Sequence, residues 1–146
     1  AQVLKDFDVK FEARVLSAHR TPKECVEFIR DAESRGVRVF IAAAGLAAHL
    51  PGVVAAHTRR PVIGLPIGAG PLKGNDALLS IVQMPPGVPV ATVGIDNAKN
   101  AALLAVQILA VADDSLDAKL TEFKLEQAKQ VLVKDALLQE KIGGMS

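Results

Sequence analysis

Apolar residues along the chain follow two alternating patterns: short, nearly unbroken apolar runs and longer segments in which apolar residues recur at helical spacing. The short runs predict buried strands, and the spaced segments predict helices with one apolar face. The predicted strands are Phe11–Leu16, Val37–Ala44, Pro61–Pro66 and Pro89–Ile95. The predicted helices run from Thr21 to Gly36, Pro51 to Thr58, Asp76 to Gln83, Asp96 or Asn97 to Ala112, and Ser115 to Gly143. Strands that alternate with helices over short loops predict a three-layer α/β fold with a doubly wound parallel sheet.

The first long helix carries clear start and stop signals. Thr21 is a capping residue, Pro22 suits the first helical position, and Glu24 completes the pattern of a capping box. Gly36 follows the last position of the apolar pattern, where a glycine commonly ends a helix.

The beginning of the chain does not fit a complete fold of this kind. "AQVLKDF" has a helical pattern without a capping residue, and no strand comes before it. The first strand of a doubly wound sheet is normally central, with later strands on both sides of it. The predicted strand Phe11–Leu16 would therefore lack a neighbour. We expect residues 1–146 to form a single α/β domain that lacks an N-terminal strand and part of its first helix, and to be poorly stable alone.

Composition limits the partners and the cellular compartment that we expect for this chain. The chain has 146 residues, half of them hydrophobic, and a formal net charge of +1 without any basic patch, which argues against nucleic acid as a partner. Every apolar segment is interrupted well short of a membrane span. A positive mean hydropathy of +0.29 favours burial between subunits. A lone cysteine, Cys25, sits at an apolar helical position, and with no secretory leader visible it favours a buried thiol in the cytoplasm.

Polar residues with possible chemistry follow two neighbouring predicted strands. "LSAHRTP" contains His19 and Arg20, and "AAAGLAAHLPG" contains His49. Ligands of open parallel sheets bind outside the carboxyl ends of the strands, so these three side chains can face one crevice. The alternative is that each histidine is an ordinary capped or solvated loop residue, and spacing alone does not separate the two interpretations.

Small residues and glycines mark two further loops. The run from Ala42 to Ala48 could let a flat ligand approach backbone amides, although close packing of a helix on the sheet explains it equally well. "GAGPLKG" follows a strand and precedes a helix, but it lacks the spacing of a dinucleotide-binding motif. The sequence has no Walker motif, no nucleophile elbow and no metal-ligand spacing, and His57 is expected at the surface.

Five segments together resemble the N5-carboxyaminoimidazole ribonucleotide mutases of purine biosynthesis. They are "SAHRTP", "AGLAAHLPGVVAA", "PVIGLPI", "LLSIVQMPPGVPVATVGI" and "NAKNAALLAVQIL", in the family's order and over nearly the whole chain. Arg20 and "AAHLPG" favour the mutase subgroup over a related carboxylase subgroup, which typically has lysine at the arginine position. The family's N-terminal G-S-x-S-D loop, which holds phosphate and ribose, has no counterpart. Ala43, Leu46, Ala69 and Ala77 also replace residues common in the family.

The resemblance implies a flavodoxin-like fold and a carboxyl transfer from an exocyclic nitrogen to the adjacent ring carbon, without ATP, metal or organic cofactor. It makes His19 the catalytic proton carrier and Arg20 the residue that binds the substrate's phosphate. His49 would position the carboxylate and Ser17 would support the phosphate or the loop. The other residues expected to bind the ribonucleotide or enclose the CO2 intermediate are Ala18, Ala44, Gly45, Ala47, Ala48 and Leu50.

The resemblance also implies a homo-octamer, and the apolar face of the long C-terminal helix is expected to serve in oligomerisation. The alternative for that face is a helix folded back on its own sheet. Two alternative functions stay open: a carboxylase that uses aminoimidazole ribonucleotide and free CO2, and a non-catalytic nucleotide-binding subunit, for which the missing loop is the only support.

Overall fold

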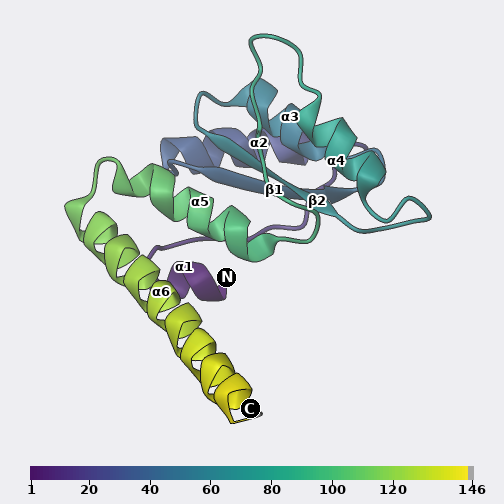
Figure 1. Ribbon diagram of the computed structural model, residues 1–146. Helices are drawn as coiled ribbons and strands as arrows, with labels where there is room; N and C mark the ends of the chain where they lie inside the picture. Colours follow the sequence, from purple (N-terminus) through teal and green to yellow (C-terminus); the bar gives the residue numbers. More distant parts are fainter. Residues whose placement is uncertain (145–146) are drawn as a thin grey trace. The chain divides into compact units, whose positions relative to one another are not determined.

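A computed structural model describes residues 1–144 of the chain (Figure 1). The helices are α1 (Gln2–Asp6), α2 (Pro22–Ser34), α3 (Leu50–His57), α4 (Asn75–Val82), α5 (Ala98–Ala110) and α6 (Asp114–Gly143), and the strands are β1 (Phe40–Gly45), β2 (Val62–Ile67) and β3 (Ala91–Thr92). The chain divides into two compact units, the first being Ala1–Leu109 and the second beginning at Ala110.

The first unit is built on a parallel sheet with strand order β1-β2-β3. β1 pairs with β2 along its whole length, from Phe40 opposite Val62 to Gly45 opposite Ile67. β3 is short, and only Ala91 and Thr92 pair with β2. Because the strands are parallel, their carboxyl ends lie at one edge of the sheet, as the predicted fold requires.

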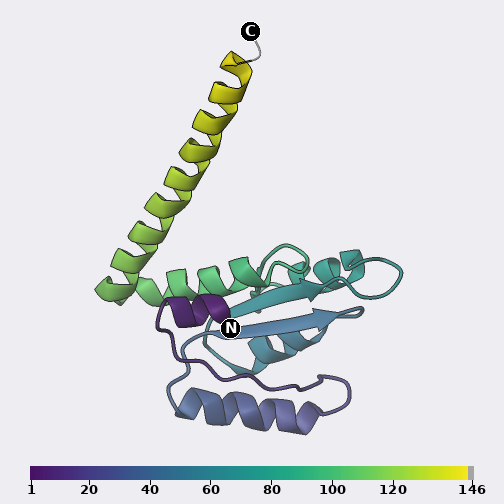
Figure 2. The ribbon, with the colours of Figure 1, turned by 90° about the horizontal axis from the view of Figure 1, so that it is seen from below.

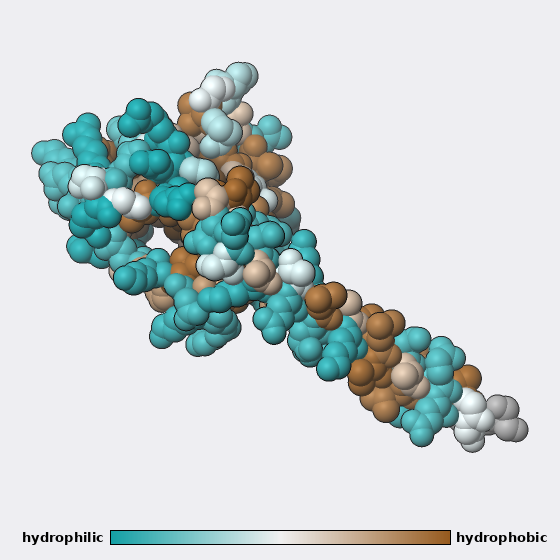
Figure 3. All heavy atoms as spheres, turned by 90° about the vertical axis from the view of Figure 1, so that its left-hand side faces the viewer, coloured by the Kyte–Doolittle hydropathy of each residue, from teal (hydrophilic) through white to brown (hydrophobic). Residues whose placement is uncertain are grey.

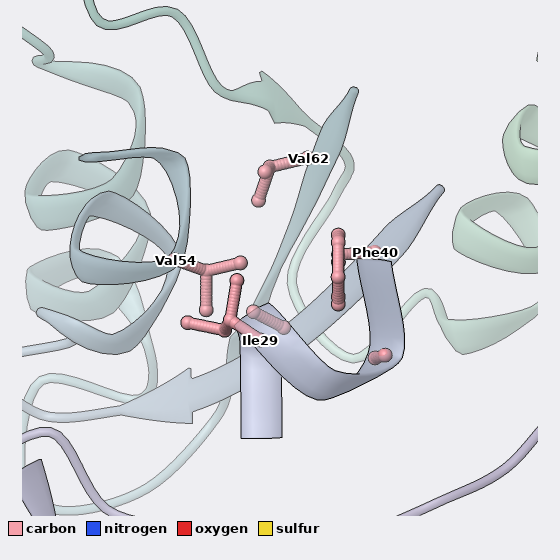
Figure 4. Close-up of a cluster of buried hydrophobic side chains, with 6 residues drawn as sticks. Ile29, Phe40, Val54 and Val62 are labelled. Atoms are coloured by element: carbon pink, nitrogen blue, oxygen red, sulfur yellow. The ribbon is translucent and has the colours of Figure 1, made fainter. Parts of the chain in front are cut away.

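Helices cover both faces of this sheet, which confirms the predicted α/β fold (Figure 1). On one face, Ile29 of α2 and Val54 of α3 pack against Phe40 and Val62 (Figure 4). Ile81 of α4 extends the same layer with Ala48 and Ala77. On the other face, Ile63 and Leu65 pack against Ala101 and Ala105 of α5. Successive side chains of β2 therefore pack against helices on opposite faces of the sheet, as strand geometry requires.

The two ends of α2 differ in how far they follow the sequence prediction. At the carboxyl end, Gly36 has a φ of +92°, and its N–H and that of Val37 donate to the carbonyls of Glu33 and Ala32, the pattern of a Schellman motif. At the amino end the predicted capping box is wrong. Thr21 is the N-cap residue, but no side-chain capping bond forms because its hydroxyl bonds the backbone of Ser17 instead.

The predicted strand Phe11–Leu16 is also corrected by the structure. The segment has no regular secondary structure, and no strand of the sheet pairs with it. A strand exists only through hydrogen bonds to a neighbour. Residues 11–16 have the apolar pattern of a strand, but among residues 1–144 no strand lies in register beside them.

The second unit is dominated by α6, which begins one residue earlier than predicted. The side chain of Asp113 caps the helix by accepting hydrogen bonds from the backbone N–H groups of Ser115 and Leu116. Apolar side chains are exposed along α6 (Figure 3), namely Leu125, Val131, Leu132, Val133, Leu137, Leu138 and Ile142. Among residues 1–144, no helix combines the length and the apolar character that crossing a membrane would need.

Candidate active site

The turn that carries His19 is fixed by its neighbours on both sides. The backbone N–H of Ser17 donates to the hydroxyl of Thr21 at 2.8 Å, and the backbone N–H of Thr21 donates to the carbonyl of Ser17 at 2.9 Å. Inside this loop, the backbone N–H of Arg20 donates to the hydroxyl of Ser17 at 3.2 Å. Ser17 and Thr21 therefore hold the loop so that His19 and Arg20 project outward, and both side chains are exposed.

His49 reaches the same place from the loop that follows β1. It is the N-cap residue of α3, its backbone N–H donates to the carbonyl of Ala47, and Pro51 lies in the first turn of the helix. Leu46, just beyond the end of β1, has a φ of +56°, a left-handed conformation that is costly for a branched side chain. Such strained backbone tends to occur at functional sites.

His19 and His49 are in direct contact. Nε2 of His19 lies 2.6 Å from Nδ1 of His49, and the rings meet edge to face at 84° with centroids 4.7 Å apart. A hydrogen bond at this distance requires one proton between the two nitrogens, so one ring donates and the other accepts. The contact thereby fixes the orientation of both imidazoles. The sequence prediction that these residues meet, despite lying thirty positions apart, agrees with this geometry.

Arg20 supplies a positive charge that no described residue neutralises. Within residues 1–144, its guanidinium has no salt bridge or side-chain hydrogen bond, unlike Arg35, which pairs with Glu12 and Asp31. The planar guanidinium of arginine can hold two oxygens of a phosphate or carboxylate at once. The turn 17–20 thus presents an exposed imidazole next to an available anion-binding group.

The loops after β1, β2 and β3 converge at the same edge of the sheet. A Cβ on Gly45 would lie 3.1 Å from that of Ala69, so the loop after β2 packs directly on the end of β1. Asp96, after β3, accepts a hydrogen bond from the backbone N–H of Gly68 at 2.9 Å. Asp96 was expected only as one of two possible caps of α5, and the cap is Asn97, which accepts from the backbone N–H of Asn100. A signal for the role of Asp96 was its position directly after a predicted strand.

The small residues expected near the substrate fall into two groups. Ala48 is buried with Ala77 and Ile81, and Ala44 and Leu50 are half-buried and pack against the core. Ala47 is exposed, while Ala18 and Gly45 are half-buried next to the site's loops. Close packing therefore explains some of these small residues, and a role in binding stays a prediction for all of them.

Two features lie away from this edge. A cavity of about 740 Å³ is lined by β1, α2, α5 and residues 9–16, and of the expected site residues only Leu50 lines it. Cys25 also faces this cavity; burial of the thiol, and secondarily Glu24, raise its pKa. In the part of the chain that the structure describes, no three His, Cys, Asp or Glu residues are grouped as metal ligands.

Relatives of this chain carry two names, one of a mutase and one of a carboxylase. A chain from Pyrococcus abyssi named N5-carboxyaminoimidazole ribonucleotide mutase is 60% identical over 124 residues, which cover 85% of this chain and 71% of the relative. A Mycobacterium tuberculosis protein of the same name is 53% identical over all 146 residues, covering 84% of its own length. A Saccharomyces cerevisiae protein named phosphoribosylaminoimidazole carboxylase is 55% identical over 132 residues, which cover 90% of this chain but 23% of that protein.

The fold and the family model agree with these matches. The crystal structure of Treponema denticola PurE superimposes with a TM-score of 0.85 at 27% identity, covering 92% of this chain and 84% of that one. The model of the AIR carboxylase family matches residues 1–130. A match over most of the chain, with relatives above half identity, fixes the family: this chain belongs to the AIR carboxylases.

Proposed function

We propose that the chain acts in purine biosynthesis as an N5-carboxyaminoimidazole ribonucleotide mutase, an isomerase. The single observation that carries this proposal is the contact of His19 with His49 beside the free guanidinium of Arg20. Its support from relatives is the shared name at 51–60% identity over most of the chain. The reaction moves a carboxyl group from the exocyclic nitrogen N5 to the ring carbon C4.

The chemistry needs one group that first donates and then accepts a proton. Protonation of the carbamate nitrogen breaks the N–C bond and releases CO2, leaving the neutral amine. The ring carbon C4 then attacks CO2 and forms a C–C bond, after which C4 carries both a hydrogen and a carboxylate. Loss of that hydrogen as a proton restores the aromatic ring. The proton given and the proton taken balance, so the enzyme returns to its starting state.

His19 is the residue to which we assign both proton transfers. Histidine is the side chain best suited to exchange a proton near neutral pH. The hydrogen bond to His49 holds the His19 ring in one orientation, while exposure of the ring leaves it accessible to a substrate. His49 is then a positioning residue for His19 and a contact for the migrating carboxylate.

Arg20 is assigned to the substrate's phosphate. The side chain is an exposed cation without a partner in the described residues, and it is adjacent to His19 in the same fixed turn. Ser17 supports this turn through its hydroxyl. Gly45, Ala47 and their neighbours on the β1 side would lie along the ring and the CO2, with Ala18 at the edge of the turn.

We further propose that the working enzyme is a homo-octamer in the cytoplasm, with small molecules rather than nucleic acid as its partners. Released CO2 must be kept in a dry pocket, or it escapes before C4 captures it. In the isolated chain, however, His19, Arg20 and His49 are all exposed. Other subunits would close the site, and the exposed apolar residues of α6 are a surface suited to subunit contacts.

The competing activity is a carboxylase that takes aminoimidazole ribonucleotide and free CO2. The name of the yeast relative favours it, whereas most of the similar chains are named mutases. Both reactions need the same proton carrier and the same C–C bond, and they differ in whether CO2 comes from a bound carbamate or from solution.

The test supplies each substrate separately to the same preparation. With N5-carboxyaminoimidazole ribonucleotide labelled with ¹³C in its carboxyl group, in buffer purged of CO2, we expect the product to keep the label. Aminoimidazole ribonucleotide with bicarbonate should then react far more slowly. Faster turnover of the second pair would establish the carboxylase, and binding of both nucleotides without turnover would establish a non-catalytic subunit.

A further inference from the structure

The loop that joins β2 to α4, residues 68–74, lies beyond the carboxyl end of β2 and is held at both of its ends (Figure 2). At its start, the backbone N–H of Gly68 donates to the carboxylate of Asp96 at 2.9 Å. At its end, Gly74 has a φ of +88°, and a Cβ on it would lie 3.0 Å from the Cα of Gly68. The two ends of the loop are therefore in contact, and residues 69–73 form the turn between them.

A leucine from the loop after β1 packs on the middle of this turn. Cδ2 of Leu46 lies 2.6 Å from the position that a Cβ on Gly70 would take, so the leucine occupies the space that the glycine leaves open. The hydrogen bond inside the turn is long, since the N–H of Lys73 donates to the carbonyl of Gly70 at 3.3 Å. Leu46 thereby connects the loop that carries His49 to the loop after β2.

Neither backbone preference nor burial explains a leucine at position 46. Its φ of +56° brings Cβ close to a carbonyl oxygen, which is unfavourable for any residue except glycine and, to a lesser degree, asparagine and aspartate. Leu46 is also 51% exposed, so it gains only part of the stabilisation that a buried leucine would give. Strained backbone of this kind tends to be kept where it serves function. The feature that distinguishes Leu46 is its contact with Gly70.

We propose that Leu46 is a positioning residue that holds loop 68–74 against the site, so that CO2 released from the carbamate stays near C4. The inference rests on the proposed carboxyl transfer, in which Gly45 and Ala47, the neighbours of Leu46, lie along the ring and the CO2. Gly45 also contacts the base of the same loop, because a Cβ there would lie 3.1 Å from that of Ala69. An apolar side chain between the two loops closes one side of the site to water and slows the escape of CO2.

The first experiment measures the hold on the loop without substrate, in the assembled protein. Trypsin cleaves after Lys73, which is exposed in this loop, and mass spectrometry reports that cut separately from all others. Leu46→Asn removes the apolar contact but introduces a residue that tolerates the left-handed conformation. We expect cleavage after Lys73 to become at least fivefold faster, with unchanged rates after other lysines and arginines. Equal rates in the variant and the parent protein would show that Leu46 does not hold the loop.

A second substitution separates the side-chain contact from the backbone conformation. Leu46→Met keeps an apolar side chain at the same position, so cleavage after Lys73 should stay as slow as in the parent protein. If Leu46 mattered only through its backbone, the order would be reversed, because asparagine adopts positive φ more readily than methionine. Faster cleavage in Leu46→Met than in Leu46→Asn would therefore overturn the proposal.

A double-mutant cycle tests whether Gly70 is the partner of Leu46. The Cβ of Gly70→Ala would push the leucine side chain aside. Gly70→Ala should therefore accelerate cleavage after Lys73 more in the parent protein than in Leu46→Asn, where that contact is already lost. Equal acceleration in the two backgrounds would show that the residues act independently.

The second experiment asks whether the hold on the loop retains CO2. Substrate labelled with ¹³C in its carboxyl group reacts in buffer that contains unlabelled bicarbonate, and the unlabelled fraction of the product measures the escape of CO2. We expect this fraction to rise at least threefold in Leu46→Asn and to stay at the parent level in Leu46→Met. A residue that only stabilised the fold would change the amount of active enzyme but not this fraction.

The outcomes distinguish this proposal from the proposed function. An unchanged unlabelled fraction in Leu46→Asn, with product formed, would refute the retention of CO2 by Leu46 and leave the carboxyl transfer intact. Absence of product from the parent protein would refute the carboxyl transfer, and CO2 retention with it, whereas the cleavage rates would still decide whether Leu46 holds the loop.

Discussion

Replacing Gly64 tests the packing that places α4 against the sheet. Gly64 is in the middle of β2, and a Cβ there would collide with Cγ2 of Ile81, approach Cγ1 of Val90 to 3.0 Å and reach Cβ of Pro51 at 3.4 Å. Cγ2 of Ile81 is attached to a β-branched carbon and cannot swing away freely. Gly64→Ala should therefore push α4 away from the sheet, whereas Pro51 of α3 stays at an ordinary contact distance.

The expected change in the free energy of unfolding is the balance of two opposing effects. Overpacking a well-filled core costs about 1–3 kcal/mol, and replacing glycine by alanine in a compatible backbone returns about 0.4–1 kcal/mol by restricting the unfolded chain. The net loss in the free energy of unfolding is about 1–2 kcal/mol. With a urea slope of about 2 kcal/mol per molar, the unfolding midpoint should fall by about 0.5–1 M.

The control is Gly94→Ala, where the nearest side-chain atom lies 3.8 Å from the new Cβ and the residue is exposed. Urea unfolding of both variants, followed by circular dichroism, should show a lower midpoint for Gly64→Ala and an equal or higher midpoint for Gly94→Ala. A Gly64→Ala variant as stable as the parent chain would refute the claim that the sheet and α4 are in close contact at this point.

Three further outcomes are expected. Arg20→Lys should raise KM about tenfold with little change in kcat, because lysine keeps the charge but cannot form the bidentate hydrogen bonds of arginine to phosphate. Unchanged saturation kinetics would contradict the role of Arg20. The pKa of the Cys25 thiol is raised by burial and, secondarily, by Glu24, so the thiol should resist iodoacetamide at pH 8 until urea unfolds the chain. Because the folded state disfavours the thiolate, the free energy of unfolding should fall as the pH rises above about 8.5. Equal alkylation rates in the folded and unfolded chain would show that the thiol is accessible. Asp113→Ala removes the two capping hydrogen bonds of α6 and should cost about 1 kcal/mol of helix stability. Asp113→Asn is the conservative control. If both variants keep the same helical circular dichroism on heating, the cap does not stabilise α6.

The element order was predictable because local patterns specify it. The apolar runs locate β1 and β2 within three residues at each end, and Gly36 ends α2 through the left-handed conformation that glycine adopts easily. The strand Phe11–Leu16 was wrong because pairing is a property of two segments, and the apolar pattern of one segment cannot supply its neighbour. β3 is shorter than Pro89–Ile95 because its ladder with β2 is confined to Ala91 and Thr92, although the backbone N–H groups of Val93 and Asp96 still donate to the carbonyls of Gly64 and Pro66.

The site was predictable to the extent that topology governs it. The loop after Gly45 lies at the carboxyl edge of the sheet, as the fold class predicts. The approach of His19 was predicted from a strand at Phe11–Leu16 that the structure does not contain, so the contact of the two histidines agrees with the prediction but not with its reason. Their hydrogen bond through Nε2 and Nδ1 depends on side-chain rotamers, which no sequence pattern encodes. The bond between Asp96 and the N–H of Gly68 was missed because the loop path after β2 depends on tertiary contacts.

The Thr21 hydroxyl does not form the predicted helix cap because a nearby backbone group competes for it. A threonine before a proline-initiated helix predicts a capping bond, but the same hydroxyl can also bond the backbone of a preceding turn. Here it accepts from the N–H and donates to the carbonyl of Ser17. The result is a stabilised turn rather than a stabilised helix end, and this turn carries His19 and Arg20.

The most direct test of the proposed mechanism is single-turnover kinetics of His19→Asn with ¹³C-labelled N5-carboxyaminoimidazole ribonucleotide, in the assembly that binds substrate. Asparagine keeps hydrogen bonding and similar size but cannot exchange a proton near neutral pH. The mechanism predicts unchanged nucleotide binding and folding, with carboxyl transfer reduced by about 10²–10⁴-fold or more. Transfer at a rate close to that of the parent enzyme would contradict the assignment of His19 as the proton carrier.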